Sequence, residues 1–182
     1  MCGGTLNDLK RVHLDPASRS SQALTRVLLT MEGVPEPHFE ERQGLPHDLA
    51  TDEGALVIGD RALRLPHSLN TANHFDLAEL WNRHTGLPFV FAVWGARKEA
   101  ASHRVREILE HSYAHGQACL GQIEEEFTRS LDLPPGRVHT YLTRHLHFTL
   151  DREELEAMTL FFRLALHEDF DHDRFRLPAR AH

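Results

Sequence analysis

The order of apolar and polar positions in the first hundred residues predicts strands alternating with helices. Val12–Leu14 is a short buried strand, and Ser20–Thr30 is an amphipathic helix because its apolar residues recur at helical spacing. His38–Arg42 fits an edge strand. Gly54–Asp60 and Phe89–Trp94 are continuous apolar runs, which are typical of strands buried on both faces. The pattern therefore predicts an α/β arrangement around a mostly parallel sheet.

A second helix is predicted between the two apolar runs. Asp76 and Glu79 form a capping-box pattern, with Asp in place of the usual Ser or Thr, and Gly86 follows the last periodic residue. Trp81 lies on the apolar face of this helix, and we expect both Trp81 and Trp94 to be core residues.

From Ser102 onward the pattern is helical throughout. An apolar stripe runs from Val105 to Phe127, the stretch 132–137 interrupts the helices, and a last helix begins near Asp151. These helices offer several apolar faces but the sequence offers no further strand. We therefore expect them to need a sheet that this chain does not contain.

The change of character near Trp94 predicts two parts. Residues 10–92 form an α/β lobe, and residues 93–182 form a helical part that returns to another lobe. The chain has 182 residues, of which 41% are hydrophobic and 26% charged, so a packed core is expected.

Charge and cysteine usage narrow the classes of protein. The net charge of −7 argues against a general nucleic-acid binder. The sequence has no apolar run of membrane-spanning length, and its N-terminus lacks the apolar segment of a secretory signal. Cys2 and Cys119 have no metal-binding spacing. We expect a cytoplasmic protein without a nucleic-acid or membrane partner.

The fifteen histidines raise the question of a metal site. His111 and His115 are four residues apart on a predicted helix, where two side chains can share a metal ion, but no Glu completes a zinc-protease pattern. The other close pairs are His145 with His147 and His167 with His172. Surface histidines are the simpler interpretation, so no metal site is predicted from them.

Polar residues gather where the first strand ends and the first helix begins. Asp15 follows the strand, and the serine segment (Ser18, Arg19, Ser20 and Ser21) opens the helix. Ligands of open α/β sheets bind at this edge, and a helix N-terminus favours anions. A carboxylate fits better than a phosphate, because the segment lacks the glycines of a phosphate-binding loop.

Helix capping is the competing interpretation of the serine segment. Ser is a preferred N-cap, and one serine is enough for that role, so both interpretations stay open. Asp60 follows an apolar run at the same predicted edge and is a second candidate ligand-binding residue, although an N-cap is the simpler interpretation there. No G-x-S-x-G pattern supports a nucleophilic triad.

Four segments together resemble one enzyme family in order and spacing. They read LDPASRSSQALTRVLL, GALVIGDRAL, FDLAELWNRHTGLPFVFAVWGAR and YLTRHLHFTLDREELEAMTLFF. The resemblance is to the chorismate dehydratases of the futalosine route to menaquinone, and it extends from about Leu9 to about Phe170. Asp76–Trp94 and Ile58–Leu63 carry its most specific parts.

The resemblance implies a type II periplasmic-binding-protein-like fold, with two α/β lobes around a cleft. It implies a lyase that removes water from chorismate to give 3-[(1-carboxyvinyl)oxy]benzoate without a metal or organic cofactor. Chorismate carries two carboxylates, so the resemblance suits an anion-binding serine segment. Ser18, Arg19, Ser20, Ser21 and Asp60 are the substrate-binding residues that we expect.

The sequence also departs from the family. Family members begin with a strand and helix bearing a YLN-like motif and a further strand–turn segment, and neither precedes the serine segment here. Catalytic residues are expected in that N-terminal portion and are assigned to no position in this chain. Pro16-Ala17-Ser18 replaces a more uniform run of hydroxyls.

These departures lead to two functional expectations. The first is a chorismate dehydratase impaired by truncation, and the alternative is a non-catalytic binder of small carboxylates on a solute-binding-protein scaffold. Uncovered apolar helix faces, including those of Val105, Ile108 and Phe162, would favour self-association.

Overall fold

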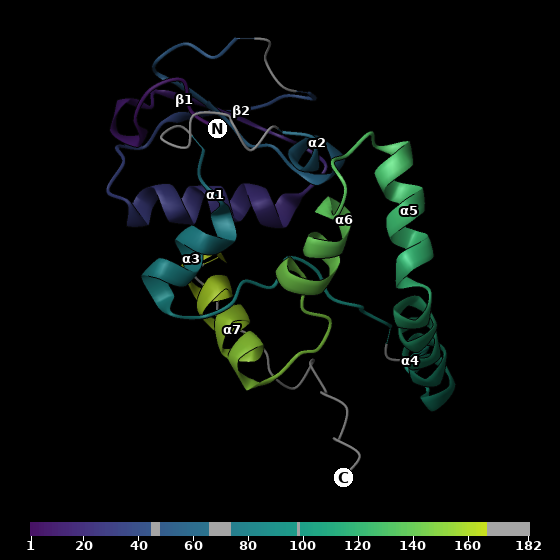
Figure 1. The fold of residues 1–182 in the computed structure, drawn as a ribbon. Helices are drawn as coiled ribbons and strands as arrows, with labels where there is room; N and C mark the ends of the chain where they lie inside the picture. Colours follow the sequence, from purple (N-terminus) through teal and green to yellow (C-terminus); the bar gives the residue numbers. More distant parts are fainter. Residues whose placement is uncertain (45–47, 66–73, 98, 167–182) are drawn as a thin grey trace. The chain divides into compact units, whose positions relative to one another are not determined.

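The structure is a computed structural model that describes residues 1–44, 48–65, 74–97 and 99–166. The chain divides into two compact units, whose elements are drawn in Figure 1. The first unit comprises Met1–Ile58, Pro66–Ala92 and Thr149–His182, and the second comprises Gly59–Leu65 and Val93–Phe148. A small parallel sheet combined with several helices confirms the α/β class.

The sheet of the first unit has three parallel strands in the order β2-β1-β3. The central strand β1 (Arg11–Leu14) pairs with β2 (His38–Glu41) and with β3 (Glu53–Ala55), so that Val12 lies opposite both Phe39 and Gly54. The predicted first strand and the predicted edge strand are confirmed. A short 3-10 turn, η1 (Leu6–Asp8), precedes β1.

Helix α1 (Arg19–Met31) is buried on two sides. One side contacts the sheet, where Leu29 packs with Val12 and Leu14. The other side contacts α3 (Leu77–Thr85) and α7 (Arg152–Leu166), which Figure 1 shows on the far side of α1 from the strands. The first unit is therefore layered as sheet, α1, and then α3 with α7.

Trp81 lies at the centre of the contact between α1 and the layer formed by α3 and α7. Its side chain is 0% exposed and packs with Leu24 and Leu28 of α1. Its ring makes edge-to-face contacts with Phe89, at 5.4 Å between centroids, and with Phe161, at 6.1 Å. Its indole Nε1 donates a hydrogen bond to the carbonyl oxygen of Pro88 at 3.1 Å. The polar atom of this buried side chain is thus satisfied.

An ionic contact joins the end of α1 to α3. Glu32, the C-cap residue of α1, accepts a hydrogen bond from Arg83, and its Oε1 lies 2.7 Å from Nε2 of His84. The His84 hydrogen bond is the largest cause of a lowered pKa of the Glu32 carboxyl, and Arg83 adds to it. The carboxylate form of Glu32 is therefore the form that the folded state stabilises.

The second unit is helical. Its elements are α2 (Gly59–Leu63), α4 (His103–Ala118), α5 (Leu120–Ser130), α6 (Arg137–Thr140) and the π-helical turn η3 (Tyr141–His145). Two arginine side chains tie α2 to the other helices: Nε of Arg64 donates to the carbonyl of Leu131 at 3.1 Å, and Arg137 donates to the carbonyl of Leu65 at 3.2 Å. The predicted helical character after Ser102 is confirmed for the described residues.

Two predicted strands differ from the structure. The run Gly54–Asp60 was expected to be one strand, but β3 ends at Ala55, and Gly59 takes a positive φ of 62° and starts α2. The prediction of a strand over Phe89–Trp94 is wrong, because the segment is irregular and Trp94 is 85% exposed. Phe89 instead packs on Trp81 and Phe161, so the start of this apolar run is held by side-chain contacts without strand pairing.

The expected core position of Trp94 is therefore wrong, whereas that of Trp81 is confirmed. The predicted stripe from Val105 to Phe127 is divided between α4 and α5 at Cys119, and Ile108 is 54% exposed. Exposure of Val105 and Ile108 agrees with the expected uncovered apolar face, and self-association stays a prediction.

In the described part of the chain, no helix has the length and apolar character needed to cross a membrane.

Replacing Trp81 by Ala should lower the free energy of unfolding of the first unit by about 3–5 kcal/mol, because it empties a fully buried site. Trp94→Ala is the matched control and should change it by less than about 0.5 kcal/mol, because Trp94 is exposed. Urea unfolding followed by circular dichroism measures both. Equal losses for the two variants would contradict the assigned core.

Glu32→Gln should lower the free energy of unfolding at pH 7 by about 0.5–1 kcal/mol, because it removes a largely solvent-screened ion pair. The pKa of Glu32 is lowered below its ordinary value of 4.5, so this stabilisation is complete above that pH and is lost as pH falls through the folded-state pKa. The difference between wild type and Glu32→Gln should therefore shrink during acid titration. The exposed Glu36→Gln variant, as a control, should track wild type throughout.

Candidate functional site

The serine segment lies where strand β1 gives way to helix α1. Asp15, the first residue after β1, is buried, and its Oδ1 accepts a hydrogen bond from the amide of Ala17 at 3.0 Å. This bond makes the tight turn that turns the chain from the sheet into α1. The helix then begins at Arg19, so the predicted position of the serine segment in the first turn of the helix is confirmed.

Ser18 is the N-cap of α1. Its Oγ accepts a hydrogen bond from the amide of Ser21 at 3.2 Å and lies 2.8 Å from the hydroxyl of Ser21. Ser21 is only 4% exposed. Capping is therefore confirmed for Ser18, and the buried Ser21 hydroxyl stabilises the cap through its hydrogen bond with Ser18.

Ser20 has a different role. Its Oγ donates a hydrogen bond to the backbone carbonyl of Phe91 at 3.0 Å. This bond brings the irregular segment after α3 to the start of α1. Within that segment, Phe91 makes an edge-to-face contact with Phe89, with 4.7 Å between the ring centroids. The serine segment is thus in contact with backbone from 71 residues further along the chain.

Hydrogen-bond donors at the N-terminal end of α1 remain available to a ligand. The backbone amides of Arg19 and Ser20 have no acceptor among the described residues, as expected for the first turn of a helix. The Arg19 side chain is exposed, and in the described ranges no carboxylate pairs with it. Two amides and one guanidinium therefore form a donor set suited to an anion, and the Ser20 hydroxyl joins it only when it gives up its bond to the Phe91 carbonyl.

Gln22 ties the start of α1 to the ends of two strands. Gln22 Nε2 donates to the backbone carbonyl of Asp15 at 3.1 Å and to Glu41 Oε1 at 3.2 Å, which links α1 to the end of β2. The site is therefore fixed on three elements, β1, β2 and α1, rather than on a free loop.

Asp60 lies in the second unit. It is exposed and is the second residue of α2, so it is not the N-cap that the simpler interpretation predicted, because Gly59 already belongs to the helix. The structure describes the two units separately, so a shared site with the serine segment stays a prediction.

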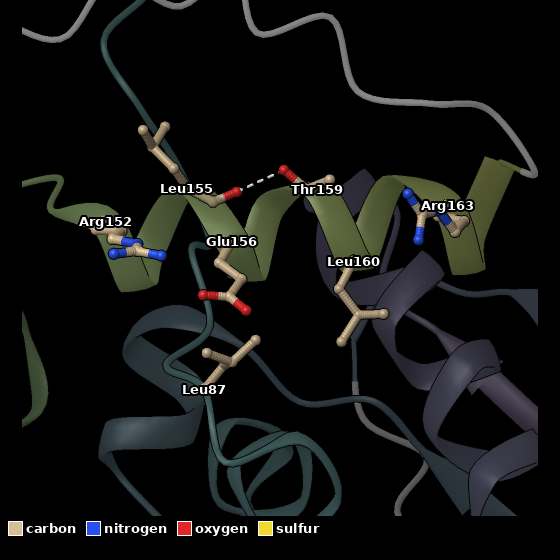
Figure 2. A pocket seen from close by; sticks show the side chains of 7 residues that line it. All are labelled: Leu87, Arg152, Leu155, Glu156, Thr159, Leu160 and Arg163. Atoms are coloured by element: carbon tan, nitrogen blue, oxygen red, sulfur yellow. Dashed lines mark hydrogen bonds between the residues drawn. The ribbon is translucent and has the colours of Figure 1, made fainter.

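A groove of about 470 Å³ lies elsewhere in the first unit, along α7 (Figure 2). Leu87, Leu155 and Leu160 form its apolar lining. Arg152 and Arg163 lie toward its two ends. None of the predicted site residues lines this groove.

Histidines were the other candidate ligands. Among the described residues, no group of three or more His, Cys, Asp or Glu side chains is placed to hold a metal ion. His111, His115, His145 and His147 are exposed, as the surface interpretation predicted. His167 and His172 lie outside the described residues.

Sequence reasoning missed two contributors to the site. The carbonyl of Phe91 gives no side-chain signal, and its segment was expected to be a strand. Gln22 was overlooked because it looked like an ordinary polar residue of the amphipathic helix, yet its amide binds both neighbouring strand ends.

Comparison with known proteins adds the observation that decides the family. A family model described as menaquinone biosynthesis matches residues 3–167, which include the serine segment and Asp60. The chain belongs to this menaquinone biosynthesis family.

Two curated proteins are similar to this chain over most of its length. It is 34% identical to the chorismate dehydratase of Thermus thermophilus over 155 residues, which cover 76% of this chain and 57% of that protein. It is 26% identical to the chorismate dehydratase of Campylobacter jejuni over 147 residues, which cover 81% of this chain and 55% of that protein. The chain thus spans a little more than half the length of these relatives.

Ser18→Ala should lower the free energy of unfolding by about 1 kcal/mol, because it removes the N-cap of α1. Ser18→Asp should keep most of this stability, since Asp is also a good N-cap. Ser20→Ala leaves the cap intact and should cost no more than about 0.5 kcal/mol. If urea unfolding ranks Ser20→Ala as the more damaging change, the capping assignment is wrong.

Proposed function

We propose that this protein acts in the dehydration of chorismate for menaquinone biosynthesis, as a chorismate dehydratase that yields 3-[(1-carboxyvinyl)oxy]benzoate. The observation that carries the proposal is the 34% identity to the Thermus thermophilus chorismate dehydratase over 76% of this chain, together with the family match. The donor set at the start of α1 gives it a chemical basis in the residues of this chain.

The reaction sets clear demands on a site. Chorismate loses its ring hydroxyl and a neighbouring ring hydrogen as water, and the ring becomes aromatic. The protein must hold the two carboxylates of the substrate so that the reacting bonds keep a fixed orientation. It must also stabilise negative charge as the ring hydrogen leaves as a proton, which donors that are already oriented do without further reorganisation.

The start of α1 supplies such donors in this proposal. The amides of Arg19 and Ser20 and the hydroxyl of Ser20 bind one substrate carboxylate, and the Arg19 guanidinium adds a charge-assisted hydrogen bond. Ser18 and Ser21 keep these donors in place through the cap. The Ser20 hydroxyl exchanges its bond to the Phe91 carbonyl for one to the substrate, so carboxylate binding is coupled to the segment that follows α3.

The remaining sequence expectations form part of the same proposal. They are a type II periplasmic-binding-protein-like fold, a lobe over residues 10–92 followed by a helical part over 93–182, and a substrate contact from Asp60. The parallel order of β2, β1 and β3 and the position of α1 after β1 support the first of these. A cytoplasmic location also stays a prediction.

Isothermal titration of the purified 182-residue chain with chorismate tests the carboxylate site. Arg19→Ala should weaken binding by about 10- to 100-fold, because it removes a charge-assisted hydrogen bond, and Ser20→Ala by about 2- to 10-fold. Thr30→Ala, at the other end of α1, is the matched control and should bind like wild type. Unchanged binding in Arg19→Ala would show that the donor set is not the substrate site.

Turnover is measured separately by following product formation. The match covers 57% of the Thermus thermophilus enzyme, so the assay includes both the 182-residue chain and a chimera that adds the unmatched part of that enzyme. We expect the chimera to dehydrate chorismate, with Arg19→Ala reducing its kcat/KM by at least tenfold. Tight binding without turnover in either protein would favour the non-catalytic binder of carboxylates.

A further inference from the structure

A thiol and an imidazole lie together on the surface of the second unit. Cys119 follows the last residue of α4, and its Sγ lies 3.7 Å from Nε2 of His115. His115 is exposed, and Cys119 is partly exposed. Both side chains are accessible to ions from solvent, and neither belongs to the donor set at the start of α1.

The distance between the two atoms matches that between two ligands of one metal ion. A tetrahedral zinc ion is bound at about 2.3 Å by sulfur and about 2.0–2.1 Å by nitrogen, which places the two ligand atoms roughly 3.6 Å apart. The 3.7 Å between Sγ and Nε2, at which the two groups share a hydrogen bond, is close to this value, so the spacing of the two atoms suits a shared metal ion.

The backbone holds the pair in this arrangement. The amide of Cys119 donates to the carbonyl of His115 at 3.0 Å, so the helical turn continues through both residues. Residues four apart on a helix lie on the same side of it, and this geometry is present before any ligand binds. A site that is already formed loses little conformational entropy on binding.

We propose that His115 and Cys119 form a surface binding site for a divalent transition-metal ion of borderline softness, such as Zn²⁺. On binding, the Cys119 thiol releases one proton and the thiolate binds the metal, while the neutral imidazole binds through the lone pair of Nε2. Because no third protein ligand is in place among the described residues, water completes the coordination shell. The metal ion keeps its charge of +2, and no oxidant or reductant is needed.

Cobalt(II) is the spectroscopic probe for this site, because thiolate ligation gives an intense charge-transfer band in the near ultraviolet. Titration of the reduced 182-residue chain should produce this band with one cobalt ion bound per chain. Cys119→Ser should abolish the band, and His115→Gln should weaken cobalt affinity at least tenfold. His103→Gln, an exposed histidine at the start of α4, is the matched control and should change affinity less than twofold.

Alkylation of cysteine in the native protein gives a second readout that does not depend on cobalt. Zn²⁺ should slow modification of Cys119 by iodoacetamide at least tenfold in wild type and much less in His115→Gln. Cys2 is buried and donates to the carbonyl of Gly4 at 3.0 Å, so mass spectrometry should assign the rapid reaction to Cys119. No thiolate band in wild type, or equal zinc protection in His115→Gln, would overturn the proposal.

Discussion

Burial of helix α1 on two sides is the constraint on which the first unit depends. In the described part of the chain the sheet has three strands of three or four residues, and such a small sheet needs a helix packed on its apolar face. Leu29 closes one face of the helix against β1, while Leu24 and Leu28 close the other against Trp81. Because both layers contact the same thirteen-residue helix, neither packs correctly unless α1 begins and ends at the right residues.

The two ends of α1 are fixed by different interactions. At the C-terminal end, Glu32 ties the helix to Arg83 and His84 of α3. At the N-terminal end, Ser18 caps the helix while the amides of Arg19 and Ser20 stay available. In the proposed function, the same serine segment serves stability and anion binding with different groups, so the two interpretations of the sequence are compatible rather than exclusive.

The sequence predicted those elements whose signals are local. Periodicity located α1, and the Asp76 and Gly86 signals located α3, whose N-cap Asp76 accepts from the amides of Ala78 and Glu79. The segment Phe89–Trp94 was misassigned because a short apolar run does not distinguish a strand from an irregular segment whose side chains pack on a helix, as Phe89 does on Trp81. Its contact with Ser20 depends on a backbone carbonyl, which carries no residue-specific signal. For the candidate site, the residue types indicated an anion ligand. Which serine caps the helix and which one bonds to the Phe91 carbonyl could be seen only in the structure.

The central claim is that the first turn of α1 binds a carboxylate of chorismate. The most direct measurement is a titration of the ¹⁵N-labelled 182-residue chain with chorismate, followed by amide chemical shifts. The account predicts that the Arg19 and Ser20 amide signals move together and saturate, while the Thr30 amide at the far end of the same helix stays in place. Saturable binding that leaves the Arg19 and Ser20 signals unmoved would contradict it.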